Sequence, residues 1–154
     1  MRRILLHLSI ILISLISCSK QETSVNKTVK ETPDKFNIND DTIKRNLNDA
    51  IKKGDTLAYI RSLKAFTVHG YEKEFLYYAI KMAEEHNYPL AYENVYTILV
   101  RISEENGYKT DSKIGDYYLL RAYELGSKSA KYDLESYYKG KKIPNSKSIL
   151  DDSK

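Results

Sequence analysis

The sequence predicts an all-α protein whose domain is an α/α solenoid of about three helix–turn–helix repeats. A ladder of small residues, Ala-x3-Gly/Asn-x3-Ala, occurs three times, centred on Gly54, Asn87 and Gly126. These centres lie 33 and 39 residues apart, a spacing typical of helical repeats, and an aliphatic residue stands seven positions before each. A Gly or Asn can end a helix in the left-handed conformation, and the flanking alanines let two helices approach closely.

Residues 1–17 have the composition of a secretory signal peptide. Two arginines are followed by a largely apolar run of 13 residues, which is too short to span a bilayer as a helix. The run ends in the segment 15–18, Leu-Ile-Ser-Cys, which resembles the lipobox of bacterial lipoproteins. The resemblance implies that Cys18 is acylated, becomes the mature N-terminus and anchors the protein in a membrane. The alternative is ordinary signal cleavage after Ser19.

The lipoprotein resemblance also implies a location in the bacterial cell envelope. Ser19 is not the Asp that retains many lipoproteins in the inner membrane of enteric-type bacteria, which favours the outer membrane. The segment 19–22 partly resembles the acidic signal that sends some Bacteroidota lipoproteins to the cell surface, but it has one acid where that signal usually has two. Periplasmic and surface facing therefore both stay open.

The next segment, 18–39, is expected to be the acylated cysteine followed by a disordered tether. It is rich in polar residues and nearly free of large apolar ones, so it cannot bury enough apolar surface to offset the entropy of ordering. Phe36 and Ile38 are expected to dock on the first helix of the domain. A free anchor helix is the weaker alternative, because Pro33 interrupts the segment.

The helical repeat domain is predicted over residues 40–144. Its first helix is expected to begin at Asp40-Asp41 and to end at Lys53, because Gly54 can stop it and an acidic residue can cap its start. Asp55 is expected to cap the second helix, which runs to about Thr67. The predicted apolar stripe of this second helix consists of Leu57, Ala58, Ile60, Leu63 and Phe66.

The second pair is expected from about Tyr71 to His86 and from Pro89 to about Ser103. Proline suits the first position of a helix, so Pro89 marks the start of the second member. This pair is the most hydrophobic of the three, which predicts that it lies at the centre of the core.

A polar stretch over 104–112 separates the second pair from the third. The third pair has apolar positions at helical spacing that include Ile114 and Leu119, and Gly140 and Pro144 end it. The remaining segment, 145–154, is a mostly polar tail. It is expected either to fray or to form a short cap over the last pair.

The third pair resembles a Sel1-like repeat, a relative of the tetratricopeptide repeat. The residues that carry the resemblance are Tyr118, Leu119, Ala122, Gly126, Ala130, Leu134 and Tyr138, followed by Gly140 and Pro144. The match is partial over 41–103, where Asn87 replaces the middle Gly. The resemblance implies an α/α solenoid that binds proteins or peptides and has no catalytic activity of its own.

Charge and composition argue against several other classes of function. The chain has 25 Lys and Arg against 21 Asp and Glu, a balance that argues against nucleic acid as a partner. One cysteine allows no internal disulfide. His69 and His86 are not accompanied by carboxylates at the spacing of a metal site. The sequence therefore predicts no catalytic residues, no metal and no cofactor, and the protein is expected not to be an enzyme.

The candidate partner-binding residues are Tyr78 and Met82 in the second pair and Tyr117 and Arg121 in the third. They occupy equivalent positions beside the predicted core stripe of each first helix, and Tyr, Met and Arg are common anchors of protein interfaces. In the alternative interpretation, the tyrosines pack between neighbouring helix pairs.

Three functions follow from these observations. The leading hypothesis is a lipid-anchored adaptor or scaffold that holds another protein at the bacterial envelope. An alternative is an immunity lipoprotein that neutralises a toxin in the periplasm, since small exported Sel1-like lipoproteins resemble such inhibitors. A small envelope hydrolase is the third hypothesis, for which the sequence offers no polar cluster.

Overall fold

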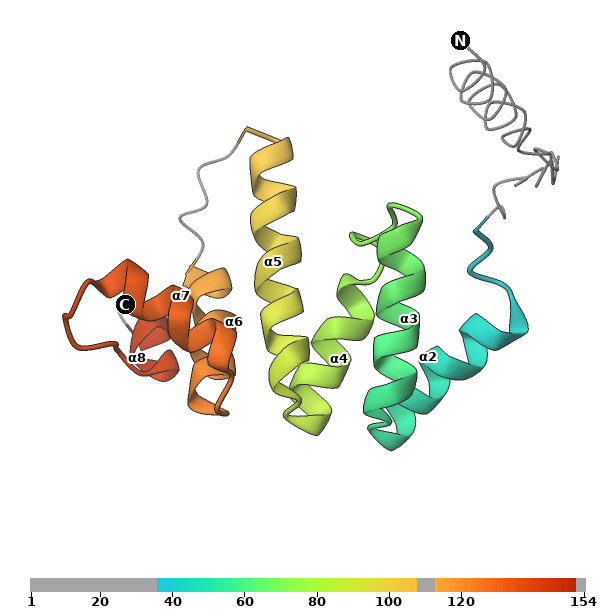
Figure 1. Cartoon of the computed structure of the whole chain (residues 1–154), viewed down its shortest axis with the longest axis horizontal. Helices are drawn as coiled ribbons and strands as arrows, with labels where there is room; N and C mark the ends of the chain where they lie inside the picture. The colour runs from blue at the N-terminus through green and yellow to red at the C-terminus, as the bar shows by residue number, and fades with distance from the viewer. Residues whose placement is uncertain (1–35, 108–112, 152–154) are drawn as a thin grey trace, which may run out of the picture. The chain divides into compact units, whose positions relative to one another are not determined.

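The computed structural model describes residues 36–107 and 113–151. This part of the chain is all-α and contains no strand, so the predicted all-α class is confirmed (Figure 1). The predicted signal peptide, Cys18 and the tether up to residue 35 lie outside the described residues. The described helices are α2 (Asp41–Lys53), α3 (Thr56–Val68), α4 (Leu76–His86), α5 (Pro89–Glu105), α6 (Lys113–Glu124), α7 (Lys128–Tyr138) and α8 (Ser146–Asp151).

The central residues of the small-residue ladder lie in the turns within the three helix pairs, α2–α3, α4–α5 and α6–α7. Gly54, Asn87 and Gly126 all have positive φ angles, of 68°, 51° and 89°. The six alanines that flank these residues are all buried, with exposed fractions of 3% or less. Asp55 caps α3, because its side chain accepts hydrogen bonds from two backbone amides at the start of that helix. The predicted role of the ladder in three tight helix–helix turns is confirmed.

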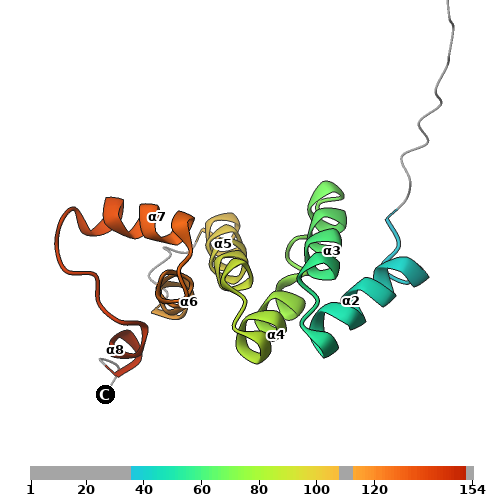
Figure 2. The same ribbon diagram turned by 60° about the horizontal axis from the view of Figure 1, so that its bottom comes forward.

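Successive helices pack in pairs that follow one another in chain order. α2 packs against α3, α4 against α5, and α6 against α7, while α5 also packs against α6 and α2 contacts α4. Figures 1 and 2 show this order in two views, with α8 lying beside α6.

Aromatic rings fill the core between the first two pairs. Tyr59, Phe66 and Phe75 are each fully buried, and the ring of Phe75 lies 5.2 Å from the rings of both Tyr59 and Phe66. Phe75 does not belong to a helix. The predicted helical start near Tyr71 is wrong, because 72–75 forms turns and α4 begins at Leu76.

Part of the predicted apolar stripes is also wrong. Leu57, Ile60 and Ile114 are 62%, 41% and 59% exposed. On α3 the buried face instead runs through Ala58, Tyr59, Ser62 and Phe66. Hydrophobicity alone did not define the rotation of the helix, since a buried serine and two exposed aliphatic residues break the pattern.

Phe36 begins the described part of the chain and packs on the end of α3. Its ring stacks on Tyr71 at 4.7 Å and on His69 at 5.2 Å, and it forms a T-shaped pair with Phe66 at 5.0 Å. The expected docking site was α2, whereas the ring contacts are with α3 and the turn after it. Ile38 is 40% exposed.

The segment after α7 contains a short helix, α8, which packs against α6. Glu124 at the end of α6 accepts hydrogen bonds from the Ser146 backbone N–H at 2.7 Å and from the Ser146 hydroxyl at 2.9 Å. Ser146 is 1% exposed. Of the two expectations for 145–154, the cap over the last pair therefore holds as far as residue 151, and the folded domain extends beyond the predicted end at residue 144.

Candidate partner-binding surface

The four predicted partner-binding residues do not form one continuous surface. Met82 is 0% exposed and belongs to the core, so the prediction that its side chain is available to a partner is wrong. Tyr78 is half-buried, and its ring lies about 6 Å from those of Phe66 and Phe75. For Tyr78 the contacts match the alternative interpretation, in which the tyrosine packs between helix pairs. Met82 is buried because α4 turns the face that carries positions 79, 82 and 83 inward.

Tyr117 and Arg121 lie in a second group of side chains on α6. The Tyr117 ring is 5.3 Å from that of Tyr118, and Cζ of Arg121 lies 5.6 Å from the ring centre of Tyr92 on α5. Arg121 also donates a 2.8 Å hydrogen bond to Glu124, which raises the pKa of the guanidinium. Arg121 thus stabilises the contact between α5 and α6, and a role for it and Tyr117 in partner binding stays a prediction.

A pocket that sequence reasoning missed lies where α5, α6 and α7 meet. Its volume is about 110 Å³. Leu119, Leu120 and Leu134 are buried and supply its apolar floor. The other lining residues are Tyr96, Asp116, Asp133, Tyr137 and Tyr138.

Tyrosine rings form much of the pocket wall and rim. Tyr96 comes from α5, and Tyr137 and Tyr138 come from the end of α7. The rings of Tyr137 and Tyr138 are 5.1 Å apart with an interplanar angle of 74°, so they face different directions. Tyr137 is 74% exposed, whereas Tyr96 and Tyr138 are half-buried. The rim therefore exposes aromatic surface to solvent, whereas the leucines of the floor are buried.

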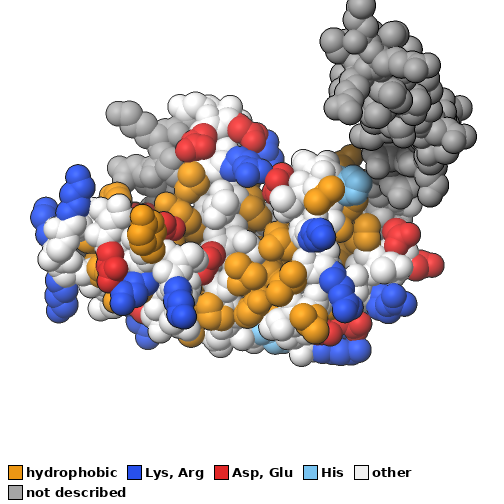
Figure 3. Space-filling view, viewed as in Figure 1, with side chains coloured by type: hydrophobic (Ala, Val, Ile, Leu, Met, Phe, Trp, Pro, Cys, Tyr) orange, Lys and Arg blue, Asp and Glu red, His pale blue; other side chains and the backbone are white. Residues whose placement is uncertain are grey.

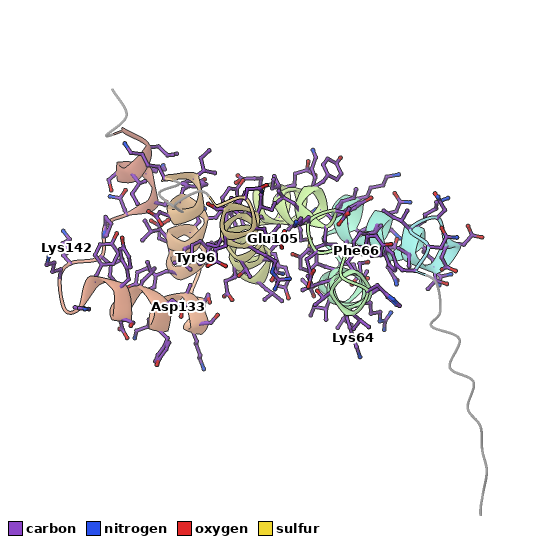
Figure 4. All side chains as sticks on the ribbon, turned by 90° about the horizontal axis from the view of Figure 1, so that it is seen from above. Lys64, Phe66, Tyr96, Glu105, Asp133 and Lys142 are labelled. Atoms are coloured by element: carbon purple, nitrogen blue, oxygen red, sulfur yellow. The ribbon has the colours of Figure 1, made fainter. Side chains whose placement is uncertain are left out.

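Two carboxylates, those of Asp116 and Asp133, line the pocket. Burial, together with the charges of Asp116 and Asp133, raises the pKa of the Tyr96 hydroxyl, and burial with the charge of Asp116 raises that of Tyr138. Both hydroxyls are thus protonated and neutral at physiological pH. Figure 4 shows Tyr96 and Asp133 near each other, on α5 and α7. None of the described lining residues is Lys, Arg or His.

Positively charged side chains gather elsewhere on the domain. In the space-filling view, Lys and Arg side chains project around the end that carries α7, and hydrophobic side chains form a patch over α4 (Figure 3). The basic residues near α7 include Lys128, Lys131, Lys141 and Lys142, which lie beside shallow depressions distinct from the tyrosine-lined pocket.

The two histidines of the described domain both make contacts within the fold. His86 Nε2 lies 2.8 Å from the carbonyl oxygen of Ile51, and His69 stacks on Phe36. Within 36–107 and 113–151, no group of three or more His, Cys, Asp or Glu side chains could hold a metal ion. In the same residues no helix is long and apolar enough to cross a membrane.

The comparisons with known proteins give no match: no protein-family model matches the chain, and no curated protein or solved structure is significantly similar to it.

Proposed function

We propose that this chain is a lipid-anchored bacterial envelope protein whose helical domain binds another protein or a peptide. In this proposal, residues 1–17 are a signal peptide, Cys18 carries the lipid, and the tether leads to a solenoid of three Sel1-like repeats. The domain acts as an adaptor or scaffold by binding, without catalysis.

The observation that carries the proposal is the equivalence of the three helix pairs. Each pair turns at a residue with positive φ between two buried alanines. Contacts between successive pairs also recur at a nearly constant separation along the chain. His86 forms a hydrogen bond with Ile51, and Asn94 forms one with Tyr59, each across 35 residues. Ser129 forms a hydrogen bond with Glu93 across 36 residues. Stacked helix pairs of this kind commonly present an extended surface to protein partners.

Exposed aromatic side chains supply candidate contacts on that surface. Tyr77, Tyr132 and Tyr137 are 57%, 75% and 74% exposed. Tyrosine combines apolar area with a hydroxyl that can form hydrogen bonds, and it is enriched at protein interfaces.

The anchor is tested by the mass of the mature protein and by labelling with a palmitate analogue. We expect a mature N-terminus at an acylated Cys18 and incorporation of the label. The Cys18→Ala variant should lose the label and leave the membrane fraction, whereas Ser19→Ala should behave like the wild type. A mature, unacylated chain that begins at Lys20 would show ordinary cleavage after Ser19 and contradict the anchor.

The binding function is tested by crosslinking in cells. A photoreactive amino acid at position 132 or 137 is expected to capture a discrete envelope protein. The same amino acid at the exposed position 53 at the end of α2 serves as the control. Equal capture from all three positions, or none from 132 and 137, would count against a protein-binding surface on α7.

A further inference from the structure

We propose that the pocket between α5, α6 and α7 receives the cationic end of an arginine or lysine side chain that the protein partner presents. This inference rests on the proposed protein-binding function and specifies which chemistry the partner inserts.

The size of the pocket suits one side chain. Its volume is about 110 Å³, whereas a cavity of about 150 Å³ holds benzene and drug-sized ligands need roughly 300 Å³ or more. The end of one arginine or lysine therefore fits, and a nucleotide or a larger cofactor does not.

The pocket can accommodate both the aliphatic stem and the charged end of an arginine or lysine side chain. The apolar floor of Leu119, Leu120 and Leu134 can cover the methylene groups, as happens when long basic side chains bury their stems. The rings of Tyr137 and Tyr138 present faces in two directions at the rim. A cation within about 6 Å of a tyrosine ring centre is attracted to the face of the ring.

The charge of the pocket selects a cation over an anion. Asp116 and Asp133 line it from α6 and α7, and a carboxylate pairs well with a guanidinium or an ammonium group. An acidic side chain or a phosphate would instead meet the like charge of Asp133. Tyr96 lines the same pocket, and its neutral hydroxyl can accept a hydrogen bond from the bound group.

The test is titration of the full mature chain with short blocked peptides, followed by NMR. The probes are Gly-Arg-Gly and Gly-Lys-Gly, with Gly-Gln-Gly as the neutral control and choline as a small cation. We expect the Arg and Lys peptides to bind with Kd values near the millimolar range, typical of a single side chain, and to shift the signals of α5, α6 and α7. The neutral peptide should not shift them.

Two variants on α7 form a matched pair. Tyr137 and Tyr132 are 74% and 75% exposed, but only Tyr137 lines the pocket. Tyr137→Ala should therefore weaken binding of the Arg peptide about fivefold, while Tyr132→Ala leaves it unchanged. Asp133→Asn should weaken binding by a similar factor. These three side chains are exposed, so the variants should keep the wild-type helical circular dichroism.

Several results would overturn the inference. These are absence of binding, equal binding of the neutral peptide, equal effects of the Tyr132 and Tyr137 substitutions, or tighter binding of choline than of either basic peptide. Crosslinking to an envelope protein that persists unchanged in Asp133→Asn and Tyr137→Ala would reject the pocket while leaving the proposed function intact. Peptide binding without any protein crosslink would reject the partner and the proposed function together.

Discussion

At the scale of single residues, Gly54 allows a close approach between the first two helix pairs. It ends α2 with a φ of 68°, and a Cβ atom placed on it would lie 2.8 Å from Nδ1 of His86. The other ring nitrogen of His86 lies 2.8 Å from the Ile51 carbonyl oxygen at the end of α2. A side chain at position 54 would therefore disturb both the turn and the histidine that bridges the pairs.

We expect Gly54→Ala to lower the free energy of unfolding by about 2–4 kcal/mol, because backbone strain and a steric clash add. Gly126→Ala is the matched control. Gly126 has a similar positive φ, of 89°, but a Cβ atom there would have nothing within 4 Å, so a loss of about 1–2 kcal/mol is expected from strain alone. Urea denaturation followed by circular dichroism gives both values. Equal losses of unfolding free energy in the two variants would mean that the His86 side chain moves away from position 54 without an energetic cost.

The turn residues could be predicted from the sequence, whereas the side chains around them could not. Gly54 and Asp55 carry a local signal, because a stop with positive φ and a cap depend on adjacent residues only. The burial of Met82 and the exposure of Leu57 depend on how each helix is rotated against its neighbours. Apolar residues lie on more than one face of α3 and α4, so their spacing alone did not fix that rotation.

At the scale of elements, α8 is fastened to α6 by the carboxylate of Glu124. Burial on its own would raise the pKa of this carboxyl, but hydrogen bonds from the Ser146 backbone, Arg121 and the Ser146 hydroxyl together lower it below its usual range. A carboxyl whose pKa is lowered by folding stabilises the folded state when it is ionised. That stabilisation is present above the unfolded pKa and is lost as pH falls through the folded value.

We expect Glu124→Gln to lower the free energy of unfolding by about 1–2 kcal/mol at neutral pH, since it weakens charged hydrogen bonds. The difference from the wild type should shrink as pH falls below about 4.3, the ordinary pKa of a glutamate. Glu135→Gln is the control, because Glu135 is exposed and forms only a 3.7 Å pair with Lys131. Thermal unfolding between pH 3 and pH 7 measures the effect. A difference that does not change with pH would show that the Glu124 charge does not hold α8.

The sequence alone could not distinguish a frayed tail from a cap, because the hydrogen bonds that hold α8 join residues that are far apart in the chain. Glu124 and Ser146 are 22 residues apart. α8 has 6 residues, which is too short to show a helical period. The same limit applies to 71–75, where Glu72 pairs with Arg101 of α5 at 2.8 Å and helps to hold the turns that precede α4.

At the scale of the whole described domain, buried aromatic rings couple the first two pairs. Phe75 contacts Tyr59 and Phe66 from the turn before α4, and Tyr59 also forms a T-shaped pair with Tyr88 at 5.6 Å. The Tyr59 hydroxyl accepts a 2.9 Å hydrogen bond from Asn94 of α5. These contacts predict that residues 36–107 unfold as one unit.

Phe75→Ala is expected to lower the free energy of unfolding by about 3–5 kcal/mol, because it removes a fully buried ring. Tyr77→Ala, in a ring that is 57% exposed, should change stability by less than about 1 kcal/mol. The chain has no Trp, so tyrosine fluorescence and circular dichroism provide two independent probes. Their urea transitions should coincide in the wild type. Separate transitions would show that the helix pairs unfold independently, as they can in repeat proteins.

At the scale of the whole domain, the pocket depends on the packing of three helices, α5, α6 and α7. Asp133 and Tyr137 are four residues apart on α7, a spacing that places both on one helix face and could have been noticed in the sequence. Tyr96 lies on α5, 37 positions before Asp133, and no local pattern brings the two together. Only the packing of α5, α6 and α7 makes a pocket from them.

The position of α8 has a consequence for protein design. Helical repeat arrays are lengthened by stacking a further pair on the last one. Here α8 contacts α6, the first helix of the last pair, as α4 contacts α2, the first helix of the first pair. An engineer who wished to append a fourth pair would have to delete Ser146–Asp151, because this short helix already covers part of the surface that the new pair would need.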